Sequence, residues 1–180
     1  MAEPKYSKRA RKDAAALVAS ATAAVNASLA LKGQMKEVKQ ADPAEILGWA
    51  KRIAQLADDK LAEDVVLLDM REFCSFTDYF LIVTGRNTRQ VKGIYDEILI
   101  KMKQESRLIA RGVAGETEAD WIVVDYVDIV VHIMTPEQRT FYRLEELWSD
   151  VPRVPVELSE RPAVAASDDA GDLDDTDDDY

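Results

Sequence analysis

The sequence predicts one mixed α/β (α+β) domain with extensions of different composition at both ends. Short runs of β-branched residues alternate with longer stretches of helical periodicity along the middle of the chain. With 180 residues, 47% of them hydrophobic, the chain is long enough for one substantial core. Its central segment, 119–134 (ADWIVVDYVDIVVHIM), has the composition of two buried strands joined by a short turn.

Charge divides the chain into three parts. Residues 1–42 carry eight Lys or Arg and four acids, residues 43–158 carry fourteen and twenty-one, and residues 159–180 carry one and nine. We therefore predict a folded domain over 43–158, between a basic Ala-rich extension and an acidic disordered tail. The net charge of −7 on the folded part disfavours bare nucleic acid, which needs clustered cations, and favours a basic protein partner.

The basic extension, 1–42, admits three interpretations. Its apolar stretch 14–31 is mostly alanine interrupted by serine and asparagine, which makes a poor signal peptide. The basic, acid-poor composition also fits an organelle transit peptide. We favour a partly helical or disordered extension of a cytoplasmic protein. The single cysteine, Cys74, excludes an internal disulfide and agrees with a reducing compartment.

The first helix is expected to begin at Pro43 and to end near Lys60. Asp42 supplies an N-cap, Pro43 suits the first helical position, and apolar residues then recur every three or four positions. Two apolar strands are predicted next, at 64–69 and at 79–84.

The second helix is predicted to follow an N-cap at Asn87. Gln90, three residues further on, completes a capping pattern, and an apolar stripe continues to about Gln104. A short strand is expected over 108–113, before an acidic turn leads into the central segment.

The central hairpin pairs 120–125 with 128–134. Because side chains alternate along a strand, Trp121 and Asp125 should share one face and Tyr126 should point to the other. An aromatic ring and a carboxylate are therefore expected to lie together at one end of the sheet.

The third helix is predicted after Thr135 and Pro136, which repeat the capping pattern. Its apolar face would consist of Phe141, Leu144, Leu147 and Trp148. Two prolines then impose an extended exit over 151–158. The segments together predict about five strands in a mixed sheet and three helices.

The sequence gives weak support for catalysis. The turn 84–87 lies between a strand and a helix, but it lacks the further glycines or the Gly-Lys-Ser/Thr of a phosphate-binding loop. Asp125 and Asp128 are three residues apart, whereas two metal ligands on one strand are normally two apart. Cys74 and His132 could form a nucleophilic pair only if the fold joined them, and one cysteine with one histidine cannot make a Cys/His zinc site. We expect His132 at the edge of the core with one nitrogen bonded, and we expect no metal or cofactor.

The remaining pattern is that of a docking surface. Exposed Trp and Tyr anchor protein interfaces, and carboxylates beside them select a partner rich in Lys and Arg. The candidate partner-binding residues are Trp121, Asp125, Tyr126 and Asp128, together with Thr77, Asp78 and Tyr79 at the start of a neighbouring strand.

Motifs in this order resemble the ribosomal silencing factor family (RsfS, or Iojap-related). They are TDYF (77–80), TG (84–85), RQV (89–91), DWIVVDY (120–126), DIVVH (128–132) and FYRLEELW (141–148), and the resemblance covers about 44–158. It implies a nucleotidyltransferase-like fold that has lost its catalytic residues. Val127 stands where many members have glycine, which puts the shape of the hairpin turn in question.

The resemblance also implies a function. Such a protein would bind ribosomal protein 14 of the large subunit where the small subunit docks, repress translation when nutrients are scarce, and act in late large-subunit assembly. The seven candidate residues would face that partner, and a homodimer is also compatible with the sequence. The alternative is a nucleotidyltransferase-like enzyme acting on a nucleotide or RNA.

Overall fold

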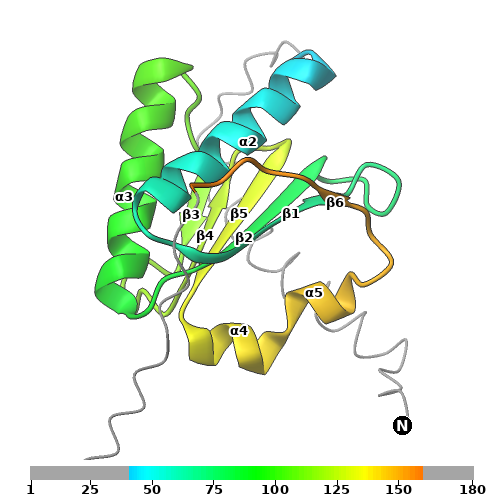
Figure 1. Cartoon of the computed structure of the whole chain (residues 1–180). Helices are drawn as coiled ribbons and strands as arrows, with labels where there is room; N and C mark the ends of the chain where they lie inside the picture. The colour runs from blue at the N-terminus through cyan, green and yellow to red at the C-terminus, as the bar shows by residue number, and fades with distance from the viewer. Residues whose placement is uncertain (1–40, 160–180) are drawn as a thin grey trace, which may run out of the picture.

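The computed structural model describes residues 41–159, so the predictions for 1–40 and 160–180 lie outside the described residues. The elements in chain order are α2 (Pro43–Asp59), β1 (Glu63–Asp69), β2 (Tyr79–Thr84), α3 (Thr88–Glu105), β3 (Gly112–Ala114), β4 (Trp121–Asp125), β5 (Ile129–Met134), α4 (Pro136–Tyr142), α5 (Leu144–Leu147) and β6 (Arg153–Val154). Helices α2 and α3 lie on one side of the sheet, and the shorter α4 and α5 lie on the other (Figure 1). The mixed α+β architecture predicted from the sequence is confirmed.

The sheet has six strands in the order β3-β4-β5-β2-β1-β6. Strands β2 and β5 are parallel, and every other neighbouring pair is antiparallel. The parallel pair joins segments that lie far apart in the sequence and brings the first residues of both strands to one end of the sheet. There the backbone N–H groups of Asp78 and Tyr79 both donate to the carbonyl oxygen of Asp128, at 2.9 and 3.0 Å.

The sheet separates two apolar cores, because alternate side chains of each strand point to opposite faces. The larger core lies under α2 and α3 and includes Ile53, Leu81, Ile94, Val124 and Ile133, all fully buried. The smaller core, on the side of α4 and α5, includes Leu68, Phe80, Ile82, Val130, Met134 and Leu144.

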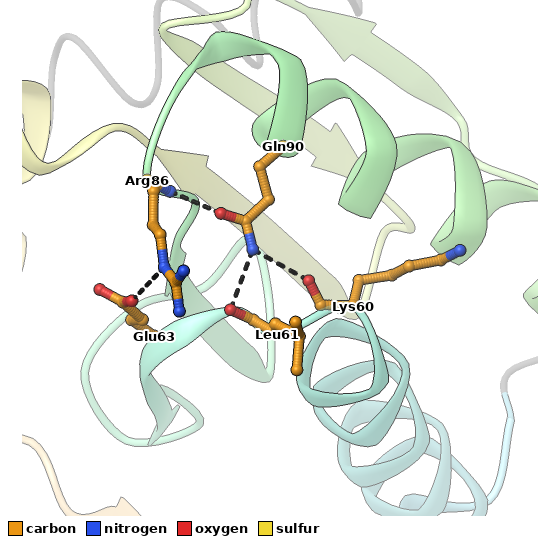
Figure 2. Close-up of polar contacts among 5 residues, drawn as sticks. All are labelled: Lys60, Leu61, Glu63, Arg86 and Gln90. Atoms are coloured by element: carbon orange, nitrogen blue, oxygen red, sulfur yellow. Dashed lines mark hydrogen bonds and ion pairs between the residues drawn. The ribbon is translucent and has the colours of Figure 1, made fainter. Parts of the chain in front are cut away.

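Side chains cap the two long helices as predicted. The Asp42 carboxylate accepts the N–H of Ala44 at 2.8 Å, and the Asn87 amide oxygen accepts the N–H of Gln90 at 2.9 Å. The end of α2 is also tied to the start of α3 through the Gln90 side chain (Figure 2). Its Oε1 accepts the N–H of Arg86 at 2.8 Å, while its Nε2 donates to the carbonyl oxygens of Lys60 and Leu61 at 3.0 and 2.9 Å.

The prediction of a strand over 108–113 is wrong in its bounds. The chain leaves α3 through Arg107, which has a left-handed φ of 54°. It reaches the sheet only at Arg111, whose N–H donates to the carbonyl oxygen of Asp125 at 2.6 Å. The strand is therefore β3, shorter and closer to the C-terminus than predicted. The extended exit adds a sixth strand, β6, which pairs with β1.

The predicted third helix is broken in two. Arg143 takes a left-handed φ of 45° and separates α4 from α5. The break turns Phe141 outward, and it is 78% exposed instead of lying on the expected apolar face. Thr135 makes no side-chain cap, and the Gln138 side chain donates to the carboxylate of Asp120 at 2.6 Å.

Candidate functional site

The seven candidate residues lie at two ends of the central hairpin. Trp121 begins β4 and Asp125 ends it, about 13 Å apart along the strand at ~3.3 Å per residue. The expectation that this aromatic ring and this carboxylate lie together at one end is therefore wrong: they share a face but occupy opposite ends of the strand. Asp128 and the segment 77–79 gather at the Asp125 end, because β2 and β5 are parallel. We call the two sites the Trp121 end and the carboxylate end, the latter defined by Asp78, Asp125 and Asp128.

Most of the candidate residues are buried, which corrects the expectation of an exposed aromatic surface. Thr77, Tyr79, Asp125 and Tyr126 are each at most 5% exposed. Tyr79 and Tyr126 point to the face covered by α2 and α3 and belong to the larger core. Trp121, Asp78 and Asp128 are half-buried and remain partly accessible.

At the carboxylate end, Asp125 supports the hairpin turn. Its Oδ1 accepts the N–H of Val127 at 2.7 Å. Val127 has a φ of 77°, a conformation that is strained for a β-branched side chain. The turn is therefore made without glycine, at the cost of backbone strain, and the Asp125 carboxylate is partly occupied in holding it.

At the carboxylate end, Asp78 lies within electrostatic reach of Arg71, whereas no described cation neutralises Asp128. Burial, and then the charges of Asp78 and Asp125, raise the pKa of Asp128 above its ordinary value. The described ion pairs include no cation for Asp128; the nearby Arg71 is paired with Asp69 at 2.5 Å and lies over the Tyr79 ring. A cation from outside would be favourable here, since it would relieve the repulsion among three carboxylates.

At the Trp121 end, the indole is held by two side chains. Its Nε1–H donates to Nδ1 of His132 at 3.3 Å, and its ring packs against Tyr142 with centroids 4.6 Å apart. Trp121 pairs with Met134 across the ladder, so His132 is its diagonal neighbour on the same face. The outer strand β3 pairs only with residues 123–125, and it gives Trp121 no paired neighbour on the other side.

His132 is bonded through one nitrogen, as predicted, but it is fully buried instead of lying at the edge of the core. Burial lowers its pKa to about 4, so the ring is neutral near pH 7. The Phe80 ring packs edge-on against it, with centroids 5.2 Å apart. Strand order explains the difference, because β5 lies between β4 and β2 in the interior of the sheet.

The sequence patterns missed Arg139, Tyr142 and the contact of His132 with Trp121. Arg139 donates to Thr84 at 2.7 Å and is ion-paired with Glu145, so it joins the end of β2 to both short helices. No sequence signal marks this contact, because the helix break at Arg143 creates it. An open pocket of about 580 Å³ lies here, and both arginines that line it are ion-paired with glutamates.

Within 41–159, no three His, Cys, Asp or Glu side chains are grouped so that they could share a metal ion. In the same part of the chain, no helix has the length and apolarity needed to cross a membrane.

Comparisons with known proteins agree on one family. The family model described as "Ribosomal silencing factor during starvation" matches residues 43–179, further into the acidic tail than the motifs reach. A protein of Halalkalibacterium halodurans named "Ribosomal silencing factor RsfS" is 40% identical over 100 residues, which are 56% of this chain and 85% of that protein.

More distant relatives and a solved structure extend the comparison. The mouse protein named "Mitochondrial assembly of ribosomal large subunit protein 1" is 31% identical over 116 residues, covering 61% of this chain and 50% of that one. A crystal structure from Chromobacterium violaceum matches with a TM-score of 0.55 and 27% identity, and the match covers 71% of this chain and 98% of that one.

Proposed function

Because the chain belongs to the ribosomal silencing factor family, we propose that it binds ribosomal protein 14 of the large ribosomal subunit and so prevents the small subunit from joining. Its action is steric and not enzymatic, and it damps translation when nutrients are limiting. A second role in late large-subunit assembly is supported by the name of the mouse relative.

The observation that carries this proposal is the crowding of carboxylates around Asp128, which no described cation neutralises. Asp78 and Asp128 are both half-buried; burial, and then the charges of Asp78 and Asp125, raise the pKa of Asp128, and the described residues supply no ion pair for it. A Lys or Arg of a basic ribosomal protein placed between them would gain from both charges. The charge therefore supports a cationic protein surface as the partner.

The Trp121 end supports the same partner in a different way. A half-buried indole offers apolar area at little entropic cost, because its contacts with His132 and Tyr142 already restrict its rotamer. Together, the two ends of β4 would provide an apolar anchor and an electrostatic one, about 13 Å apart at ~3.3 Å per residue.

Co-sedimentation with purified large subunits, followed by a subunit-joining assay without ATP or GTP, tests the proposal. The protein should pellet with large subunits, and joining should fall in proportion to occupancy. Purified ribosomal protein 14 in excess should compete for the protein and restore joining. The charge contribution is tested with Asp128→Asn, and Asp96→Asn, at an exposed position of α3 outside the carboxylate end, provides a loss of one charge as the control.

The enzymatic alternative makes the opposite prediction. Nucleotide turnover that rises and falls with inhibition of joining across point variants would replace steric blocking with catalysis. The protein should be found in the compartment of the ribosome that it binds, and we propose that this is the cytoplasmic ribosome. Import of the full chain into an organelle, lost on removal of 1–42, would instead identify that segment as a transit peptide.

A further inference from the structure

His132 is a buried polar side chain whose presence the fold alone does not explain. It is fully buried, its Nε2 has no hydrogen-bond partner among the described residues, and its ring is surrounded by the apolar side chains of the smaller core. An unpaired buried donor is destabilising, because it has given up its hydrogen bonds to water and gained none in return. An apolar side chain of similar size would avoid that cost, so stability by itself does not favour histidine here.

The one hydrogen bond of His132 defines its tautomer. The indole Nε1–H of Trp121 can only donate, and therefore Nδ1 of His132 must be the acceptor and the ring proton must be on Nε2. Burial lowers the pKa of His132 to about 4, which keeps this acceptor available near pH 7. The unsatisfied Nε2–H is thus a direct consequence of using Nδ1 to hold the indole.

The surroundings of Trp121 show why such an acceptor matters. On the β3 side the indole has no paired neighbour, because the β3 ladder stops at Val123. On the β5 side it contacts His132, and Tyr142 from α4 packs against its ring. Without the hydrogen bond, only van der Waals contacts would restrain an aromatic side chain at the margin of the sheet.

We propose that His132 is a positioning residue for docking: its Nδ1 fixes the indole of Trp121 in the orientation that the partner recognises. The inference rests on the proposed function, because it assigns His132 a part in presenting the apolar anchor. His132 would then determine affinity although it is buried and never contacts the partner.

Two substitutions separate positioning from packing. His132→Leu fills a similar space and removes both the acceptor and the unsatisfied donor, so the variant should fold with little change in melting temperature. His132→Asn keeps an acceptor oxygen near the position of Nδ1 but leaves a small void, so it should be the less stable variant. Positioning predicts the reverse order for affinity: His132→Leu should bind large subunits about tenfold more weakly than wild type, and His132→Asn within about threefold.

The indole itself gives a second readout that does not require the ribosome. The Nε1–H resonance of Trp121, assigned with Trp121→Phe because the chain has three tryptophans, should move in His132→Leu toward the position of a free indole. It should stay nearer the wild-type position in His132→Asn. An unchanged resonance in His132→Leu would overturn the inference, whatever the binding result.

Binding distinguishes failure of this inference from failure of the proposed function. If wild type binds large subunits and Trp121→Ala does not, equal affinities of wild type and His132→Leu would overturn the positioning role alone. Equal losses in the two His132 variants would assign the residue to packing and overturn it as well. Absence of binding by wild type would reject both proposals.

Discussion

The two ends of β4 differ in the polar groups that they contain and in what those groups do. At the Trp121 end, a buried neutral ring accepts a hydrogen bond, and its pKa lies below the ordinary value. At the carboxylate end, acids are crowded together, and the pKa of Asp128 lies above its ordinary value. The first arrangement holds a side chain in place, whereas the second leaves a charge that an external cation can satisfy. A restrained indole and a cluster of acids thus lie at opposite ends of one five-residue strand, and the proposed function uses both.

Acid should affect the Trp121 end most strongly. In the unfolded chain, His132 is protonated below its ordinary pKa of 6.5. In the folded protein its pKa is lowered to about 4, so it is protonated only below that pH. Stability conferred by the neutral ring should therefore be lost as pH falls from 6.5 to 4, by about 3 kcal/mol at ~1.4 kcal/mol per pH unit. Urea unfolding across this range should show the loss in wild type and not in His132→Leu. Parallel curves for the two proteins would show that His132 does not govern the acid response.

Removing the indole should weaken docking more than it weakens the fold. Trp121→Ala should cost about 2 kcal/mol or more of binding free energy, while the half-buried side chain should contribute about 1–2 kcal/mol to folding. Pelleting and thermal melting of the same preparation measure both quantities. The larger loss expected for a core tryptophan, about 3–5 kcal/mol, would place Trp121 with the structural residues instead.

The strained turn between the two strands should respond to glycine. Val127→Gly should relieve the positive φ of Val127 and stabilise the protein by up to about 1 kcal/mol, with partial cancellation from the greater freedom of the unfolded chain. Chemical denaturation checks the sign. Val127→Ala is the matched control, because it shortens the side chain and retains a Cβ at positive φ.

Removing a charge from the carboxylate end should have the smallest effect on stability. It should stabilise the fold slightly and weaken binding. Asp128→Asn should stabilise the fold by about 0.5 kcal/mol, since it removes the cost of burying a charge and then the repulsion from Asp78 and Asp125. It should weaken binding about fivefold at low salt and less at high salt. In wild type, Asp128 is charged above its raised pKa, and its repulsion by the neighbouring carboxylates then destabilises the fold. This destabilisation disappears as the pH falls through that pKa. Loss of stability in Asp128→Asn would show that this carboxylate has a favourable partner.

Local signals were sufficient for much of the fold. The caps Asp42 and Asn87, the apolar run of β2 and the central hairpin were predicted close to their observed bounds. In each of these segments the deciding interactions lie within a few residues, and side-chain periodicity reports them. The failures at 108–113 and at Arg143 occurred where positive φ values at Arg107 and Arg143 redirect the chain, and no glycine marks either position.

The sequence by itself determined the mixed α+β class, the hairpin and the residue types available for docking. The tertiary structure decided how those residues are used. It buried Tyr79 and Tyr126 beneath α2 and α3, and it joined Trp121 to His132 across a ladder diagonal. It also brought Asp78 beside Asp128, because β2 and β5 run parallel although fifty positions separate the two acids. Which strands are neighbours depends on the packing of the whole sheet, and the periodicity within one segment does not predict it.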